Sequence, residues 1–187
     1  MKELLINPGF LGSLSGAVIT GTIALIVMQG NIKFERNLRN KEELKKYIKE
    51  ATYLKMYVTR LISTMNQYTK YQREEENLGQ ATDQDGFPTD ELNEIMFAKN
   101  MIEEDVKRYI TKIKGSKRED ILEEYFDDYL EIIDITETGI EYFWERSIKN
   151  RTDGVADILN EEIKKLQESN EKLKKSIEKQ QGKISEI

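Results

Sequence analysis

The chain has 187 residues, of which 34% are charged, with a formal net charge of −6 and no cysteine or histidine. Without cysteine there is no disulfide framework or thiol chemistry, and without histidine there is no triad or metal site that uses imidazole. The negative charge argues against nucleic acid as a partner, because affinity for phosphate is mostly electrostatic. The abundance of Glu, Lys, Ile and Leu, with only two prolines, predicts an all-α protein.

The first predicted element is a single N-terminal transmembrane helix over residues 10–29, after a short extracytoplasmic N-terminus over residues 1–9. Residues 10–28 read FLGSLSGAVITGTIALIVM, without a charge. As a helix they span about 28 Å, close to the roughly 30 Å of the hydrocarbon core. Asn7 and Pro8 suit a helix start. A cleaved signal peptide and a buried core helix are the alternatives, disfavoured by the missing small-x-small cleavage site and the missing polar face.

Basic residues set the expected orientation of this segment. Only Lys2 precedes it, whereas many cations follow it closely. The positive-inside rule therefore places the C-terminal side in the cytoplasm and the N-terminus outside. The expected localisation is the cell membrane, as a single-pass protein with the lipid bilayer as a partner. The cations that follow are Lys33, Arg36, Arg39, Lys41, Lys45, Lys46 and Lys49.

Small side chains recur at every fourth position along two adjacent rows of the membrane segment. Such rows let a second helix approach closely, which favours association between copies in the membrane. The alternative, of equal weight, is that Gly and Ser are simply common in membrane helices. The residues expected to pack against a second helix are Gly12, Gly16, Ala17 and Gly21.

Residues 31–150 are predicted to form a small antiparallel helical bundle in the cytoplasm, from three helices. The first continues from the membrane to about Leu78, and a turn over residues 79–88 follows. Within that turn, Asp83 and Asp85 resemble part of a calcium loop, but its first and last positions lack carboxylates, so an ordinary turn is favoured. The apolar stripe of the first helix is Leu44, Tyr47, Ala51, Leu54, Val58, Leu61, Met65 and Tyr68.

Helical periodicity predicts a second helix over residues 90–114 and a third that begins near Lys117, with a possible kink at Gly139. Their aromatic side chains follow helical spacing and are interpreted as bundle core. The inward residues expected on the second helix are Ile95, Met96, Met101, Ile102, Val106, Tyr109, Ile110 and Ile113. Those expected on the third are Ile121, Leu122, Tyr125, Phe126, Tyr129, Ile132, Ile133, Ile140, Phe143, Trp144 and Ile148.

Residues 153–187 are predicted to form a C-terminal coiled-coil helix. β-Branched residues at heptad position a with Leu at position d favour two parallel strands, and one Asn at a fixes their register. The pattern therefore predicts a parallel homodimer. Gln180 at a d position and the few charges at the flanking positions weaken the prediction of a homodimer. The alternative is an amphipathic helix folded back on the bundle. The seam residues are Leu159, Ile163, Leu166, Asn170, Leu173, Ile177 and Ile184.

The third helix is densely acidic. The pairs Glu91/Glu94 and Glu124/Asp127 are similar to the paired motif of all-α nucleotide pyrophosphohydrolases, which implies Mg²⁺ held by carboxylates and phosphate hydrolysis. In a chain this rich in Glu, a solvated acidic face, which could instead dock a basic partner, is the favoured interpretation. No cofactor and no catalytic residue is predicted.

Three functions from different classes follow from these features. The leading hypothesis is a membrane-tethered, non-enzymatic interaction or scaffold protein that dimerises through its tail and presents a helical surface to an unidentified cytoplasmic protein. The second is a membrane-active effector, holin-like or abortive-infection-like, that oligomerises through its Gly-rich segment. A carboxylate-Mg²⁺ hydrolase ranks third.

Overall fold

A computed structural model describes residues 8–78, 88–116, 121–142, 144 and 154–186. Nearly all of these residues are helical, which confirms the all-α class. The chain divides into two compact units, an N-terminal unit of residues 1–43 and a bundle unit of residues 44–186. Residues 1–7 of the segment predicted to be extracytoplasmic lie outside the described residues, as do Asp83 and Asp85 of the turn that resembles a calcium loop.

Helix α1 extends over Pro8–Leu78, as the sequence predicts. Its start at proline fits, because the first helical N–H has no partner within a helix and proline lacks it. Among the described residues, α1 is the one helix long and apolar enough to span a membrane, and none of its most apolar window is buried. In the bundle unit, by contrast, all eight residues of the predicted apolar stripe of α1 are buried.

Helix α2 extends over Asp90–Lys114, the predicted bounds. The hydroxyl of Thr89 caps it by accepting a hydrogen bond from the backbone N–H of Leu92 at 3.4 Å. Acidic residues in its first turn and lysines in its last complement the helix dipole. The inward placement of Met101 is wrong: this side chain is 60% exposed, beside Phe97 on the outer face. Its neighbour Ile102, also predicted to be inward, is buried. Adjacent residues of a helix point about 100° apart, so the apolar type of Met101 did not by itself place it in the core.

The third predicted helix is interrupted in the structure. A 3₁₀ turn, η3 (Glu123–Tyr125), leads into α3 (Phe126–Asp134), and a π-helical stretch, η4 (Ile135–Glu141), follows. Gly139, the predicted kink, lies in this π-helical stretch. The side chain of Glu162 approaches it so closely that a Cβ there would displace the carboxylate. Residues 117–120, Phe143 and Ile148 are outside the described residues.

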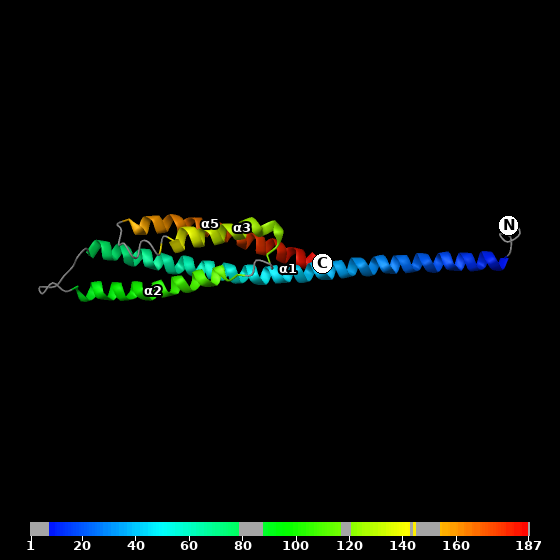
Figure 1. The fold of residues 1–187 in the computed structure, drawn as a ribbon, viewed down its shortest axis with the longest axis horizontal. Coiled ribbons are helices and arrows are strands. Elements are labelled where there is room, and N and C mark those ends of the chain that lie inside the picture. The colour runs from blue at the N-terminus through cyan, green and yellow to red at the C-terminus, as the bar shows by residue number, and fades with distance from the viewer. Residues whose placement is uncertain (1–7, 79–87, 117–120, 143, 145–153, 187) are drawn as a thin grey trace. The chain divides into compact units, whose positions relative to one another are not determined.

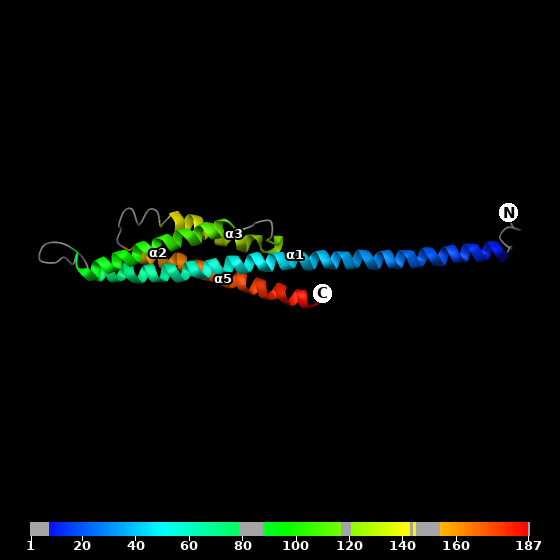
Figure 2. The same ribbon diagram turned by 90° about the horizontal axis from the view of Figure 1, so that it is seen from below.

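Helix α5 (Val155–Glu186) follows Gly154, whose φ of 81° is a conformation that favours glycine. The helix lies beside the second half of α1, within the bundle unit, and runs antiparallel to it (Figures 1 and 2). Contacts between the two helices set this direction: Asp157 pairs with Arg73, Asn170 with Thr59, and Ser176 with Tyr47. The foldback of α5 on the bundle, which the sequence offered only as the alternative to a coiled coil, is therefore the arrangement found in the single chain.

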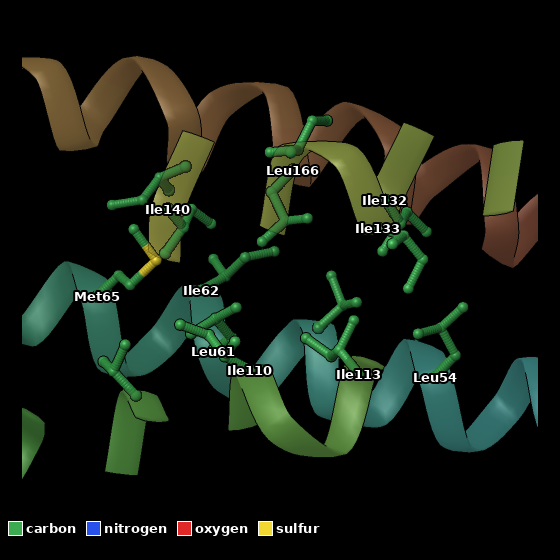
Figure 3. Packing of buried hydrophobic residues seen from close by; sticks show 14 of the residues in the cluster. Leu54, Leu61, Ile62, Met65, Ile110, Ile113, Ile132, Ile133, Ile140 and Leu166 are labelled. Carbon is green, nitrogen blue, oxygen red and sulfur yellow. The ribbon is translucent and has the colours of Figure 1, made fainter. Parts of the chain in front are cut away.

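The other helices alternate in direction around α1. Tyr47 stacks on Tyr125 and Tyr68 contacts Trp144, so α3 and η4 run parallel to α1. Lys99 of α2 contacts Gln72, while Ile110 lies beside Leu61, so α2 is antiparallel to α1 (Figure 3). The result is four helical segments in up-down-up-down order. The fourth one is α5, which the sequence placed outside a three-helix bundle.

One apolar core joins all four segments. Leu61 of α1 lies beside Ile110 of α2, Met65 of α1 lies beside Ile140 of η4, and Leu166 of α5 closes the cluster from the other side (Figure 3). Full burial of each such side chain contributes about 1.5–3 kcal/mol. The bundle unit is thus held together mainly by apolar stripes that helical periodicity had marked.

Candidate functional site

The coiled-coil seam of α5 is the first candidate interaction surface. Six of its predicted residues are buried within a single chain, with exposed fractions from 0% at Leu166 to 9% at Asn170, and the seventh, Ile184, is half-buried. Their contacts are with the chain's own bundle. Pairing of this seam with a second copy stays a prediction, and it would need α5 to leave the bundle because one face cannot contact both.

Polar residues beside the seam are buried as well. Ser169 and Gln180 are 0% exposed and Ser176 is 5% exposed. Ser169 and Ser176 occupy heptad position g, which carries charges in most two-stranded coiled coils. Buried serines there widen the contact face of α5 to the width that a four-helix bundle needs. The few charges at these flanks were therefore a sequence signal for the foldback.

Two buried side-chain amides of the seam form a hydrogen bond through their nitrogen but, within the described ranges, none through their oxygen. Asn170 donates from Nδ2 to the hydroxyl of Thr59 at 3.1 Å, and Gln180 donates from Nε2 to the hydroxyl of Tyr125. Their oxygens, Oδ1 of Asn170 and Oε1 of Gln180, are buried without a hydrogen-bond partner among the described residues. A buried acceptor left unpaired costs about 1–3 kcal/mol. The seam is therefore well packed but imperfectly matched to its own bundle.

Tyr47 anchors a polar cluster at one end of the seam. Its hydroxyl forms a hydrogen bond with the hydroxyl of Ser176, and its ring stacks on Tyr125 with centroids 5.3 Å apart. Burial raises the pKa of Tyr47 to about 12, although the bond to Ser176 opposes the shift. Burial also raises the pKa of Tyr68. Both hydroxyls therefore stay neutral near pH 7, and the hydroxyl of Tyr47 acts as a hydrogen-bonding group.

The acidic face of the third helix contacts lysines of α5. Glu124 pairs with Lys179 at 2.5 Å and with Lys183 at 3.7 Å, and Glu131 pairs with Lys172 at 2.8 Å. The hydrogen bond from Lys179 lowers the pKa of Glu124. The basic partner that the acidic pattern allowed is thus, in this structure, the chain's own fourth helix.

Carboxylates do not gather into a metal-sized cluster within the described ranges. No three His, Cys, Asp or Glu side chains converge there in a way that could hold a metal ion. Glu91 and Glu94 lie exposed in the first turns of α2, while Glu124 is engaged with lysines of α5. The convergence of the two carboxylate pairs that the hydrolase hypothesis needs is therefore not among the observed contacts.

The apolar part of α1 is the second candidate surface. Its large side chains are exposed throughout, for example Val18 at 62% and Ile26 at 64%. Ala17 is exposed too, and a Cβ added at Gly12, Gly16 or Gly21 would meet nothing within 4 Å. The four positions Gly12, Gly16, Ala17 and Gly21 thus leave room for the close approach of a second helix.

The outer side of α2 is the third candidate surface. Phe97 is 70% exposed and Met101 is 60% exposed, one helical turn apart. A shallow groove beside them is lined by Asp90, Asn93, Glu94 and Phe97. Apolar side chains next to carboxylates suit a partner that is apolar and basic.

The fold and these surfaces define an all-α protein with one helix that could span a membrane and a helical bundle without a metal cluster among its described residues. No known protein family, curated protein or solved structure matches the chain.

Proposed function

We propose that this protein is a membrane-tethered, non-enzymatic interaction protein, anchored by the first part of α1 and presenting the bundle unit to a protein partner in the cytoplasm. The observation that carries the proposal is the exposure of every large apolar side chain described between Leu14 and Met28. A continuous apolar surface of this length is unfavourable in water and favourable in a bilayer.

The charge distribution supports an N-terminus outside and a bundle in the cytoplasm. The cations that follow the apolar segment, from Lys33 to Lys49, outnumber the single Lys2 ahead of it. The first of those cations, Lys33 and Arg36, lie within about 12 Å of Met28 along the helix, close enough to contact anionic headgroups. Such contacts contribute about 1 kcal/mol for each cation near the surface.

Two features support an interaction role. Ionisable and hydrogen-bonding groups of the bundle are used for packing: Glu124 and Glu131 bind lysines of α5, and Tyr47 binds Ser176. Meanwhile Phe97 and Met101 remain exposed on α2 beside carboxylates. We propose that this part of α2 contributes to the docking surface and that the small-residue rows of α1 associate copies in the membrane.

Cell fractionation with a topology reporter tests this proposal. The full chain should resist extraction of membranes with alkaline carbonate, and a reporter fused after Ile187 should be active only in the cytoplasm. A chain released by carbonate would contradict the membrane anchor. A C-terminal reporter that is active only outside the cytoplasm would show that the orientation is the opposite one.

A dye-leakage assay separates the scaffold from the membrane-active alternative. Liposomes that contain the full chain should retain a small entrapped dye as well as liposomes that contain a variant in which Gly12, Gly16 and Gly21 are leucine. Leakage that depends on these glycines would favour the effector instead.

A further inference from the structure

Helix α5 carries one contact face that fits two different partners. In the structure the face packs on α1 and on the third helix of its own chain. The same residues form heptads with Ile at position a and Leu at position d, the pattern of a two-stranded parallel coiled coil. We propose that α5 exchanges between its own bundle and the α5 helix of a second copy, and that the second copy binds through this same seam.

Asn170 is the residue that distinguishes the two states. In the bundle its Nδ2 reaches Thr59, but its Oδ1 is buried with no hydrogen-bond partner among the described residues. In a parallel pair of α5 helices, Asn170 faces its counterpart, and each amide donates to the other's oxygen. The paired state therefore satisfies an acceptor that the bundle leaves unpaired.

Gln180, further along the seam, also has a side-chain oxygen without a hydrogen-bond partner in the described part of the chain. Its side chain is 0% exposed and donates to Tyr125. It occupies a d position, so two copies of Gln180 would face each other in the pair. Both polar positions of the seam are thus complementary to themselves and only partly complementary to the bundle.

The polar contacts on the flanks of α5 favour the bundle only weakly. Its ion pairs, Lys172–Glu131, Lys179–Glu124 and Arg73–Asp157, join half-exposed or exposed side chains. Such surface pairs contribute little and are screened by salt. The apolar residues of α5, such as Leu166 and Leu173, are buried in either state, whereas the core of α1 and α3 that α5 covers is buried only in the bundle. The balance between the states therefore sets the burial of that core against the polar seam positions and the local concentration of copies.

A membrane anchor supplies that concentration. Association of α1 segments in the bilayer would hold two α5 helices within one small volume, which raises their effective concentration. This step rests on the proposed function. The exchange itself would make the pairing of α5 respond to clustering of the protein: dispersed copies keep α5 in the bundle, and clustered copies pair it.

Disulfide trapping tests the proposal, because the chain contains no cysteine that could interfere. The full chain is reconstituted in liposomes as Asn170→Cys, a position a variant, and as Lys175→Cys, whose exposed side chain is at the outer position f. After mild oxidation we expect about tenfold more covalent dimer from the first variant, because a positions face each other and f positions face away. Ile177→Cys, also at position a, repeats the measurement independently.

An intramolecular lock provides the matched control. Thr59 and Asn170 are in hydrogen-bond contact, so Thr59→Cys/Asn170→Cys places two thiols near each other, and titration of free thiols identifies the chains in which a disulfide holds α5 on its own bundle. In these locked chains an added Ile177→Cys should give no covalent dimer, whereas Ile177→Cys without the lock should. The exchange then accounts for the dimer formed by the unlocked chain.

Three outcomes would overturn the proposal. Equal trapping at positions 170, 175 and 177 would mean random collision. A disulfide between separate Thr59→Cys and Asn170→Cys copies, without trapping at 170 alone, would mean that α5 docks on the bundle of a neighbour instead of pairing with α5. Carbonate extraction of the same liposomes reports the anchor separately: embedded protein without trapping refutes the exchange and leaves the membrane tether intact.

Discussion

Asn170 of α5 donates a hydrogen bond to Thr59 of α1 at 3.1 Å, although 111 positions separate them in the chain. The hydroxyl of Thr59 in turn donates to the backbone carbonyl of Lys55 at 2.8 Å. Asn170 thus joins α5 to α1 through one bond while its own oxygen stays unpaired. The hydrogen bond from Asn170 to Thr59 therefore contributes to the stability of the bundle and also holds α5 against α1.

Replacing Asn170 with leucine should stabilise the folded chain. The change removes a buried, unpaired acceptor and adds apolar contact, and Thr59 keeps its bond to Lys55. We expect the free energy of unfolding to rise by about 1 kcal/mol. Urea titration of the full chain in nanodiscs, followed by fluorescence of the single, buried Trp144, measures it. Lys175→Leu, at an exposed position of the same helix, is the control. Destabilisation by Asn170→Leu would show that the bond to Thr59 outweighs the unpaired oxygen.

Truncation of Leu166 should weaken the bundle strongly. Its side chain is 0% exposed and lies opposite α1 and α2 in the core (Figure 3). Leu166→Ala should lower the free energy of unfolding by about 2–5 kcal/mol through lost burial and the cavity that remains. Ile158→Ala, at a side chain that is 47% exposed on the same helix, should cost far less. The same urea titration compares them, and equal effects would mean that α5 is not part of the core.

Ionisation of Tyr47 should destabilise the bundle at high pH. Burial raises its pKa in the folded chain to about 12 from 10.0. The stabilisation by the neutral hydroxyl is therefore complete below pH 10 and is lost as the pH rises from 10 to about 12, where the unfolded chain ionises first. Tyr47→Phe should cost about 1 kcal/mol near pH 7, because Ser176 loses its partner. Between pH 10 and 12 the free energy of unfolding should fall less for the variant than for the wild type. An equal fall in both proteins would show that ionisation of Tyr47 is not the cause.

A bulky residue on the small-residue rows should disrupt association in the membrane. A Cβ at Gly16 would meet nothing within 4 Å, so Gly16→Leu leaves the single chain unchanged and can act only on a contact with another helix. Energy transfer between donor- and acceptor-labelled copies in liposomes should fall for Gly16→Leu. It should not fall for Val18→Leu, which changes an exposed residue on another side of the helix. Unchanged energy transfer in both variants would mean that the glycines take no part in the association of helices.

Charge reversal on the acidic face should release α5. Glu124 pairs with Lys179 and Lys183, so Glu124→Lys replaces two attractions with repulsions. We expect more disulfide-trapped dimer from Asn170→Cys in this background, and the gain should shrink at high salt because these charges are screened. Glu123→Lys, the exposed neighbour, is the control. A gain of the same size from Glu123→Lys would point to net charge instead of the specific pairs.

Much of the local structure was predictable from the sequence. The bounds of α2, the unbroken course of α1 to Leu78 and the buried stripe of α1 all agree with the periodicity of the apolar residues. These features depend on residues three to seven positions apart, whose spacing determines one face of a helix. The π-helical stretch at Gly139 was marked only as a kink. The close approach of Glu162 to Gly139 comes from a distant helix, so the local sequence pattern does not show it.

The partner of α5 is what only the tertiary structure decided. Heptads show that one face of α5 must be covered, but an apolar seam contacts its own bundle or a second copy equally well. In this structure the bundle covers it, through buried serines at position g and amides that bind Thr59 and Tyr125. The sequence by itself determined where the helices are and which side of each is apolar. The choice of partner depends on the shape and hydrogen-bonding groups of distant residues, such as Tyr125 and Thr59, which lie 55 and 111 positions from the amides they bind and which the heptad pattern does not encode.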